Sequence, residues 1–266
     1  MTDVNLQELV HCAGHDYEPG SPHLSHPALR NEILSRIRAL VGERLARNGR
    51  CRVLEVGAGH GAFTDHVIAM GAEVTVTEMS RPSLDVLAHR YEHTPGVRLV
   101  FDPDGEAAFG SGGDYDLILC VSVLHHIPNY ESFVRRAADL LAPGGVFASF
   151  QDPTWYPRRS TASLRADRLL FLAWRIRQGR VRQGLATQLR RFRNTLDETK
   201  SGDMVEYHVV RQGVDEDKLV SVLQPLFADV ELWRYFSTQG RWMQVLGRAT
   251  MRPQTFALIA RGRWPA

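Results

Sequence analysis

Cysteine and long apolar runs are both scarce in this chain. The three cysteines, Cys12, Cys51 and Cys120, are odd in number and far apart, which excludes a disulfide framework and a Cys-x-x-Cys metal site. The apolar runs, such as Leu169–Trp174, are far shorter than the ~20 residues that span a membrane. The N-terminal sequence also lacks the basic and apolar regions of a signal peptide. We therefore predict a protein of the reducing cytoplasm.

An excess of either charge is absent as well. The chain has 32 Lys and Arg against 30 Asp and Glu, which gives a formal net charge of +2. This balance argues against a protein that binds nucleic acid over its whole surface, and no RNA- or DNA-binding motif is present. Hydrophobic residues make up 44% of the 266 residues, which excludes the disordered and fibrous classes. Abundant Arg, Ala and Gly with few Lys are typical of a GC-rich bacterial genome.

Short apolar segments alternate with helical patterns between residues 51 and 150. The predicted strands are Cys51–Val56, Glu73–Thr77, Val97–Phe101, Asp116–Val121 and Val146–Phe150. The predicted helices between them are Ala62–Met70, Pro82–Tyr91 and Tyr130–Leu141. Strands joined through helices form parallel crossover units, so we predict a parallel sheet covered by helices.

This pattern divides the chain into four segments. Residues 1–50 predict a helical cap, with its clearest helix running from Pro27 to Asn48-Gly49. Residues 51–150 form the core, residues 151–212 interrupt the alternation as an inserted helical lid, and residues 213–266 return to the core sheet.

The C-terminal segment resumes the pattern of the core. We predict a helix at Asp215–Phe227 and two strands at Asp229–Tyr235 and Thr255–Arg261. A long loop from Ser237 to Pro253 is expected between the two strands.

The strongest chemical signal is the turn after the first predicted strand, which reads VLEVGAGHG over residues 53–61. Its glycines let a ligand approach the backbone, and free N–H groups at the following helix N-terminus favour an anionic group. The spacing also fits the G-x-G-x-x-A form of dinucleotide-binding turns. Glu55 lies inside the apolar strand, where an unpaired polar group costs ~2–7 kcal/mol. We therefore expect Glu55 to hold backbone or ligand N–H groups.

Three further segments follow the glycine turn in a fixed order. Glu78 ends the next strand within TEMS, where its carboxylate could accept two ribose hydroxyls. DYDLILCVSVLHHI and LLAPGGVF follow at spacings that suit the fourth and fifth strand units. With VLEVGAGHG, these segments resemble the motifs of the class I S-adenosylmethionine-dependent methyltransferases. The resemblance covers residues 51–150 well and the C-terminal strands loosely. It implies an α/β, Rossmann-like sheet of seven mostly parallel strands with an antiparallel final hairpin.

The resemblance also implies that S-adenosyl-L-methionine is the cofactor. Gly57, Ala58 and Gly59 would face its methionine portion, with Glu55 supporting the turn, and Glu78 would bind the ribose hydroxyls.

Further cofactor contacts follow from the other motifs. Met79 would pack on the adenine, while Cys120 and Val121 would line the methionyl side with backbone groups. The family often has an acid near adenine N6 after the third strand. The chain offers Asp102 and Asp104 around a proline, and we assign this position to Asp102.

Histidines near the end of the fourth strand are candidates for acid–base chemistry. A histidine is the usual general base near neutral pH. We predict His125 as the base and His23 as the second candidate, and we assign His126 a structural role.

Residues outside the core motifs are candidates for binding the methyl acceptor. Tyr17 and His26 belong to the N-terminal cap, which folds over the cofactor in many such enzymes. Trp155 and Tyr156 follow the fifth strand at the edge where open α/β sheets bind ligands. The spacing of the N-terminal histidines matches no zinc pattern, so no metal site is predicted.

The inserted segment is unusually rich in arginine. Between Arg158 and Arg193 it holds eleven arginines, no lysine and one acid, Asp167. We consider three interpretations of this charge: a solvated helical face, recognition of an anionic substrate, and a helix at a membrane surface with Phe171, Leu172 and Trp174 on its apolar side.

Together these features predict a methyltransferase that acts on an O, N or C atom of a small molecule, in specialised metabolism. The acceptor would be anionic or hydrophobic, and no nucleic acid partner is expected. The alternative substrate is a lipid-like or isoprenoid acceptor handled at a membrane surface. Two other classes compete with these interpretations: an NAD-dependent oxidoreductase, which uses the same glycine turn, and a non-catalytic nucleotide-binding module.

Overall fold

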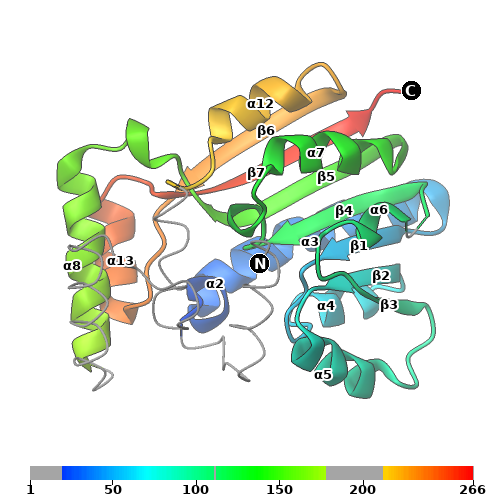
Figure 1. The fold of residues 1–266 in the computed structure, drawn as a ribbon, viewed down its shortest axis with the longest axis horizontal. Helices are drawn as coiled ribbons and strands as arrows, with labels where there is room; N and C mark the ends of the chain where they lie inside the picture. Colours follow the sequence, from blue (N-terminus) through cyan, green and yellow to red (C-terminus); the bar gives the residue numbers. More distant parts are fainter. Residues whose placement is uncertain (1–19, 111, 178–211, 266) are drawn as a thin grey trace.

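The computed structural model of the chain describes residues 20–110, 112–177 and 212–265. In these ranges the strands form a seven-stranded sheet with the order β3-β2-β1-β4-β5-β7-β6 (Figure 1). The strands are β1 (Arg52–Val56), β2 (Glu73–Glu78), β3 (Val97–Phe101), β4 (Tyr115–Val121), β5 (Leu141–Pro153), β6 (Phe227–Tyr235) and β7 (Thr255–Arg263). Strand β7 runs antiparallel to both β5 and β6, and the other neighbouring pairs are parallel. This confirms the predicted Rossmann-like sheet with an antiparallel final hairpin.

Helices cover both faces of the sheet. One face carries α3 (Pro27–Asn48), α4 (Thr64–Ile68) and α5 (Arg81–Tyr91), and the other carries α6 (Ala107–Gly110), α7 (Tyr130–Asp139) and α12 (Glu216–Leu223). Side chains alternate between the two faces of a strand. Val53 of β1 therefore joins the core under α3, while its neighbour Leu54 joins the core under α7 and α12. Both side chains are almost fully buried, and the doubly covered sheet explains why its strands are nearly continuous apolar runs.

Most predicted helices are present with adjusted ends. Helix α3 runs from Pro27 to Asn48 as predicted, and Gly49 ends it with φ = 69°. Helix α4 begins only at Thr64, because the glycine turn extends further along the chain than the periodicity suggested. Helix α12 ends at Leu223, since Phe227 already belongs to β6.

The predicted loop from Ser237 to Pro253 is wrong, because it contains helix α13 (Arg241–Thr250). The buried side of α13 is formed by Gln244 and Gly247. A Cβ atom at Gly247 would overlap the ring of Phe236, so only glycine lets the helix lie this close. The inward side of α13 thus carries a glutamine and a glycine instead of the usual apolar residues, and its large apolar residues lie on the opposite side.

The predicted start of the insertion at residue 151 is wrong, because β5 continues to Pro153 through its pairing with β7; a helical segment follows the strand, as predicted. A short 3-10 helix, η2 (Tyr156–Arg158), leads into α8 (Thr161–Arg177). The remainder of the insertion, residues 178–211, lies outside the described residues. No helix in the described ranges is both long and apolar enough to cross a membrane.

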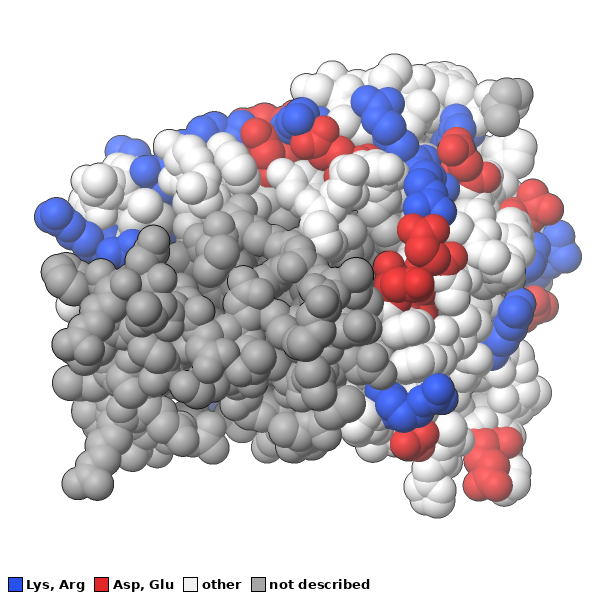
Figure 2. Space-filling model, in the orientation of Figure 1, with Lys and Arg blue, Asp and Glu red and all other residues white. Residues whose placement is uncertain are grey.

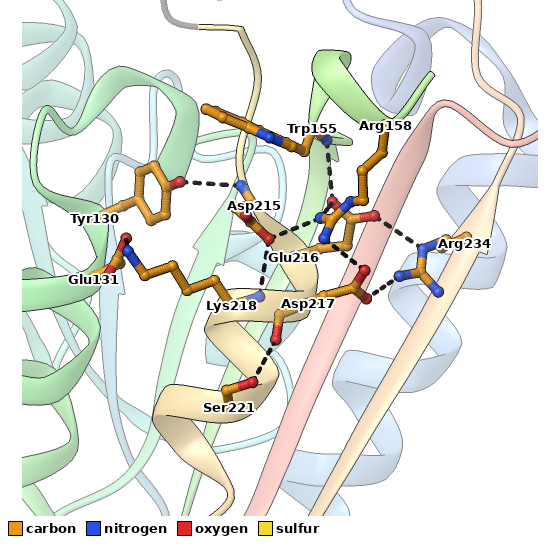
Figure 3. A network of polar contacts seen from close by, with 10 residues as sticks. All are labelled: Tyr130, Glu131, Trp155, Arg158, Asp215, Glu216, Asp217, Lys218, Ser221 and Arg234. Carbon is orange, nitrogen blue, oxygen red and sulfur yellow. Dashed lines mark hydrogen bonds and ion pairs between the residues drawn. The ribbon is translucent and has the colours of Figure 1, made fainter. Parts of the chain in front are cut away.

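A polar network attaches the start of this insertion to the core (Figure 3). The guanidinium of Arg158 lies 2.8 Å from Oδ1 of Asp215, 3.0 Å from Oε2 of Glu216 and 2.6 Å from Oδ2 of Asp217. Arg234 of β6 approaches the same Glu216 and Asp217 from the opposite side. The side chain of Glu216 is only 4% exposed, so its two arginine partners offset the cost of burying its charge.

The sheet order fixes where a ligand can bind. Strands β1 and β4 are neighbours, with Val56 opposite Cys120, and the chain proceeds outward from them in opposite directions. In open α/β sheets, such a reversal opens a crevice at the carboxyl ends of the strands. The glycine turn after β1 and the segment after β4 both lie at this edge.

Candidate active site

The glycine turn starts directly at the end of β1. The N–H of Gly57 donates a 2.8 Å hydrogen bond to the carbonyl oxygen of Thr77, which joins the ends of β1 and β2. Gly57 and Gly59 have φ values of 69° and 58°, in the left-handed region that favours glycine. A Cβ atom at Gly57 would lie 2.8 Å from Cγ2 of Val123, which follows β4. Glycine is therefore required both for the turn and for its close approach to the β4 end.

Glu78 connects β2 to this turn. Its Oε2 accepts a hydrogen bond from the N–H of Gly59 and its Oε1 accepts one from the N–H of Ser80, both at 2.9 Å. The residue is 6% exposed, and burial raises the pKa of the carboxyl group while the backbone N–H groups oppose this shift. The structure thus places a carboxylate, whose two oxygens accept hydrogen bonds, at the carboxyl end of β2, where the sequence predicts ribose recognition.

Glu55 supports the turn from behind. The side chain is buried within β1, and its Oε2 accepts a 2.7 Å hydrogen bond from the hydroxyl of Thr64 at the start of α4. Burial raises the pKa of Glu55 from 4.5 to about 7, because desolvation outweighs the stabilising bond from Thr64. The sequence predicted that this acid holds N–H groups, and the observed partner is a hydroxyl group.

The raised pKa of Glu55 predicts a pH-dependent stability. Between pH 4.5 and about 7 the folded chain retains a proton that the unfolded chain releases, so this contribution to stability is complete below pH 4.5 and is lost as the pH approaches 7. Glutamine cannot titrate, and its amide oxygen can still accept from Thr64. We expect urea unfolding to show Glu55→Gln gaining roughly 3 kcal/mol relative to the parent between pH 4.5 and pH 8. For the exposed control Glu73→Gln, we expect the unfolding free energy to change with pH in parallel with that of the parent. The same parallel behaviour in Glu55→Gln would contradict this assignment.

Asp102 follows β3 and binds the backbone of its own loop. Its two carboxylate oxygens accept hydrogen bonds from the N–H groups of Ala107 (2.9 Å) and Ala108 (3.0 Å). The residue is buried, and desolvation raises its pKa. Asp102 thus caps helix α6, and its proposed contact with adenine stays a prediction.

The end of β4 holds strained backbone. Cys120 is fully buried between Val56 of β1 and Ser149 of β5, and burial raises the pKa of its thiol well above the usual range. Ser122 follows with φ = 62°, and Gln151 after the adjacent part of β5 has φ = 68°. Left-handed residues other than glycine cost about 1–3 kcal/mol each and are concentrated at functional sites.

A histidine–aspartate pair lies beside this strained backbone. Nδ1 of His125, in the 3-10 helix η1 (Leu124–His126), lies 2.8 Å from Oδ1 of Asp152 near the end of β5. The backbone N–H of His125 donates to the same oxygen at 3.2 Å, and the hydroxyl of Ser149 donates to Oδ2 at 2.7 Å. A carboxylate is an acceptor, so Nδ1 of His125 carries the proton of this contact, and Nε2 would be the basic nitrogen whenever the ring is neutral.

Sequence reasoning missed Asp152. The residue is fully buried, although it lies in the polar segment that ends β5. An acid in that position is the signal that could have identified it, because a buried carboxylate requires partners. The partner is 27 residues away in the sequence, and only the pairing of β4 with β5 brings the two together.

The sequence is similar to those of known methyltransferases. The family profile described as "Methyltransferase domain" matches residues 54–147. The ubiquinone biosynthesis O-methyltransferase of Bordetella avium is 32% identical over 152 residues, covering 56% of this chain and 61% of that protein. The protein of the same name from Proteus mirabilis is 33% identical over 129 residues, covering 48% and 49%. The chain thus spans about half to three fifths of these relatives.

Residues 54–147 are thus similar to a methyltransferase domain, and the chain resembles S-adenosylmethionine-dependent methyltransferases.

Solved structures agree with the fold. The N-methyltransferase NodS from Bradyrhizobium japonicum, in complex with S-adenosyl-l-homocysteine, superposes with a TM-score of 0.57 at 17% identity and covers all of both chains. The CurJ carbon methyltransferase gives a TM-score of 0.50 at 16% identity, covering 98% of this chain and 67% of that one. At these identities the likeness establishes the methyltransferase fold alone.

The described part of the N-terminal segment reaches the glycine turn. His23 in helix α2 (Pro22–Ser25) is buried and stacks on Phe63, just after the turn, with 5.9 Å between ring centroids. Burial lowers the pKa of His23 from 6.5 to about 4, which makes it a weak base and favours His125 for this role. Nε2 of His26 lies 2.6 Å from the carbonyl oxygen of Thr238. Burial lowers the pKa of His26 as well. Tyr17 lies outside the described residues.

The two aromatic candidates after β5 differ in their surroundings. The backbone N–H of Trp155 donates to Oε2 of Glu216 at 3.0 Å, within the network of Figure 3. Tyr156 lines a cavity of ≈ 330 Å³, and the other lining residues are Pro157, Arg159, Leu164, Asp167, Arg168 and Gln212. Of the remaining candidates, Met79 and Ala58 are partly exposed at the site edge, and Val121 is buried. The structure therefore gathers the cofactor candidates at one sheet edge, while this cavity lies against the inserted helix.

Proposed function

We propose that this methyltransferase uses S-adenosyl-L-methionine to methylate a hydroxyl group of a small molecule. The pairing of His125 with the buried Asp152 carries the proposal, because an oxygen nucleophile must lose a proton and this pair is built to accept one. Val123, two residues before His125, lies against Gly57, so the pair adjoins the glycine turn. The relatives named as O-methyltransferases support an oxygen acceptor.

The glycine turn and Glu78 fit the cofactor. The close contact of Gly57 with Val123 leaves no room for a side chain, and Glu78 offers a carboxylate at the end of β2. Glu78 would bind the two ribose hydroxyls, and the partly exposed residues Gly57, Ala58 and Gly59 would face the methionine portion with their backbone. When bound, S-adenosyl-L-methionine supplies a methyl group whose bond to sulfur breaks as the acceptor oxygen attacks.

The chain's own residues provide orientation and proton transfer. Nε2 of His125 would accept the hydroxyl proton as the oxygen–carbon bond forms, and Asp152 would hold the ring and stabilise its positive charge. Ser149 and the backbone N–H of His125 fix the carboxylate in turn. Alignment of the reacting atoms can lower the activation barrier by ~7–11 kcal/mol. A general base can increase the rate by a further factor of about 10²–10⁴.

Two acceptor classes fit the proposal: a specialised metabolite and a lipid-like or isoprenoid molecule. The relatives named for ubiquinone biosynthesis favour the lipid-like class.

Calorimetric titration and a turnover assay test the proposed function together. We expect micromolar binding of S-adenosylmethionine and S-adenosylhomocysteine, no binding of NAD, and formation of S-adenosylhomocysteine when phenolic acceptors with and without an isoprenoid tail are added. Binding of NAD alone would overturn the proposal in favour of an oxidoreductase. Cofactor binding with turnover only on amines would overturn the oxygen acceptor but not the cofactor.

A further inference from the structure

Helix α13 has its apolar side turned to solvent. Trp242, Val245 and Leu246 are 73%, 67% and 65% exposed, and Ala249 continues the same stripe at the spacing i, i+3, i+4, i+7. Isolated exposed apolar residues are common, but a continuous stripe of large ones marks an interaction surface.

The helix is held firmly in this orientation. Nε2 of Gln244 donates to the carbonyl oxygen of Phe236 at 3.0 Å, and its Oε1 accepts from the N–H of Thr238 at 2.7 Å. Gly247 lies against the ring of Phe236, where no side chain fits. Since the polar and small residues anchor the helix, it cannot rotate its apolar stripe inward without breaking these contacts.

The apolar stripe is bordered by positive charge. Residues 237–254 contain Arg241, Arg248 and Arg252 and no acidic residue. Arg248 pairs with Glu32 at 3.1 Å, whereas Arg241 and Arg252 form no ion pair with any described residue. The combination of tryptophan, aliphatic side chains and arginine on one helix face is characteristic of binding to a membrane interface.

Helix α8 lies at the same end of the molecule and carries the same chemistry. In Figure 1 both helices stand at the left end of the long axis. Leu169 and Ile176 of α8 are 66% and 52% exposed, and Arg165 and Arg168 are exposed beside them. Figure 2 shows Lys and Arg without Asp or Glu on the visible described surface at this end, whereas both signs mix at the other end.

We propose that the outer face of α13, formed by Trp242, Val245, Leu246 and the flanking arginines, binds the surface of a membrane that contains anionic lipid. Charge complementarity selects this partner, because phosphate headgroups pair with arginine and the acyl region accepts the apolar stripe. A second copy of the chain fits less well, since a two-fold interface would bring the same unpaired arginines towards each other. This surface binding does not depend on methyl transfer, although it would suit a lipid-like acceptor.

Vesicle co-sedimentation of the full chain tests this surface. We expect the chain to bind vesicles of phosphatidylcholine with phosphatidylglycerol, and to bind vesicles of phosphatidylcholine alone at least about tenfold more weakly. The double variant Trp242→Ser, Leu246→Ser should bind the anionic vesicles at least about tenfold more weakly. The double variant Arg241→Gln, Arg252→Gln should bind them with a smaller dependence on salt concentration. Trp264→Ser is the matched control. Trp264 is another exposed tryptophan, with 52% exposure, but it lies near the C-terminus at the opposite end of Figure 1.

The alternative results are distinguishable from one another and from failure of the proposed function. Light scattering that shows a dimer dissociated by the α13 substitutions, without vesicle binding, would overturn the proposal in favour of a self-interface. Equal loss of binding in the Trp264→Ser variant would also overturn it. Circular dichroism and titration with S-adenosylhomocysteine on the same variants establish that the fold and the cofactor site are retained. A chain that binds vesicles without methylating any acceptor would refute the proposed function alone.

Discussion

Replacement of Glu78 by alanine is expected to weaken S-adenosylmethionine binding by about a hundredfold or more. Hydrogen bonds to a charged group contribute about 1.5–3 kcal/mol each, and loss of two such bonds to ribose hydroxyls gives at least about 3 kcal/mol. The substitution also releases the N–H of Gly59, so part of the loss comes from the freed glycine turn. Calorimetric titration with S-adenosylhomocysteine measures the effect directly.

The same strand offers a matched control for this variant. Glu73 begins β2 and is exposed, so Glu73→Ala changes the same charge without touching the site. Thermal unfolding without ligand reports on the folded state of both variants. If Glu78→Ala folds and binds S-adenosylhomocysteine as tightly as the parent, the assignment of Glu78 to the ribose is wrong.

Replacement of His125 by alanine is expected to leave cofactor binding within about twofold and to lower turnover by about 10²–10⁴. The imidazole would contribute to proton transfer but not to recognition of the cofactor. His89→Ala on the exposed side of α5 is the control for a lost histidine, and His126→Ala tests the neighbouring ring, which lies 4.0 Å from that of His125. Steady-state rates and titrations on the same preparations separate the two effects.

The pH profile distinguishes a base from a structural histidine. Asp152→Asn removes the charge that favours a protonated ring, so the rising limb of the rate profile should move to lower pH while the maximal rate falls. A His125→Ala variant with full turnover at every pH would exclude this residue as the base. A lower rate in Asp152→Asn with an unchanged profile would reduce Asp152 to a structural role.

Several parts of the site were predictable because their signals are local. The glycine turn, Glu55 and Glu78 lie within 24 residues of each other and follow directly from the order of strand, turn and helix. Left-handed φ values at Gly57 and Gly59 agree with the glycine spacing. Glu55 was predicted as a support of the turn, but its hydroxyl partner was not, because Thr64 carries no distinctive signal in the sequence.

Other parts depended on contacts between distant segments. His125 and Asp152 meet only because β4 pairs with β5. His26 reaches Thr238 across 212 residues, which no local pattern could indicate. Helix α13 was mistaken for a loop because its anchors, Gln244 and Gly247, are residues that normally argue against a buried helix face.

The sequence by itself determined the alternation of strands and helices, the glycine turn and the acids that border it, because short-range hydrophobic periodicity and backbone requirements encode these features. Only the tertiary structure decided which histidine is held by a buried carboxylate and which surface presents apolar side chains to solvent. Both outcomes arise from packing between segments far apart in the chain: burial of Asp152 requires a partner from β4, and the tight contact of Gly247 with Phe236 turns Trp242 outward.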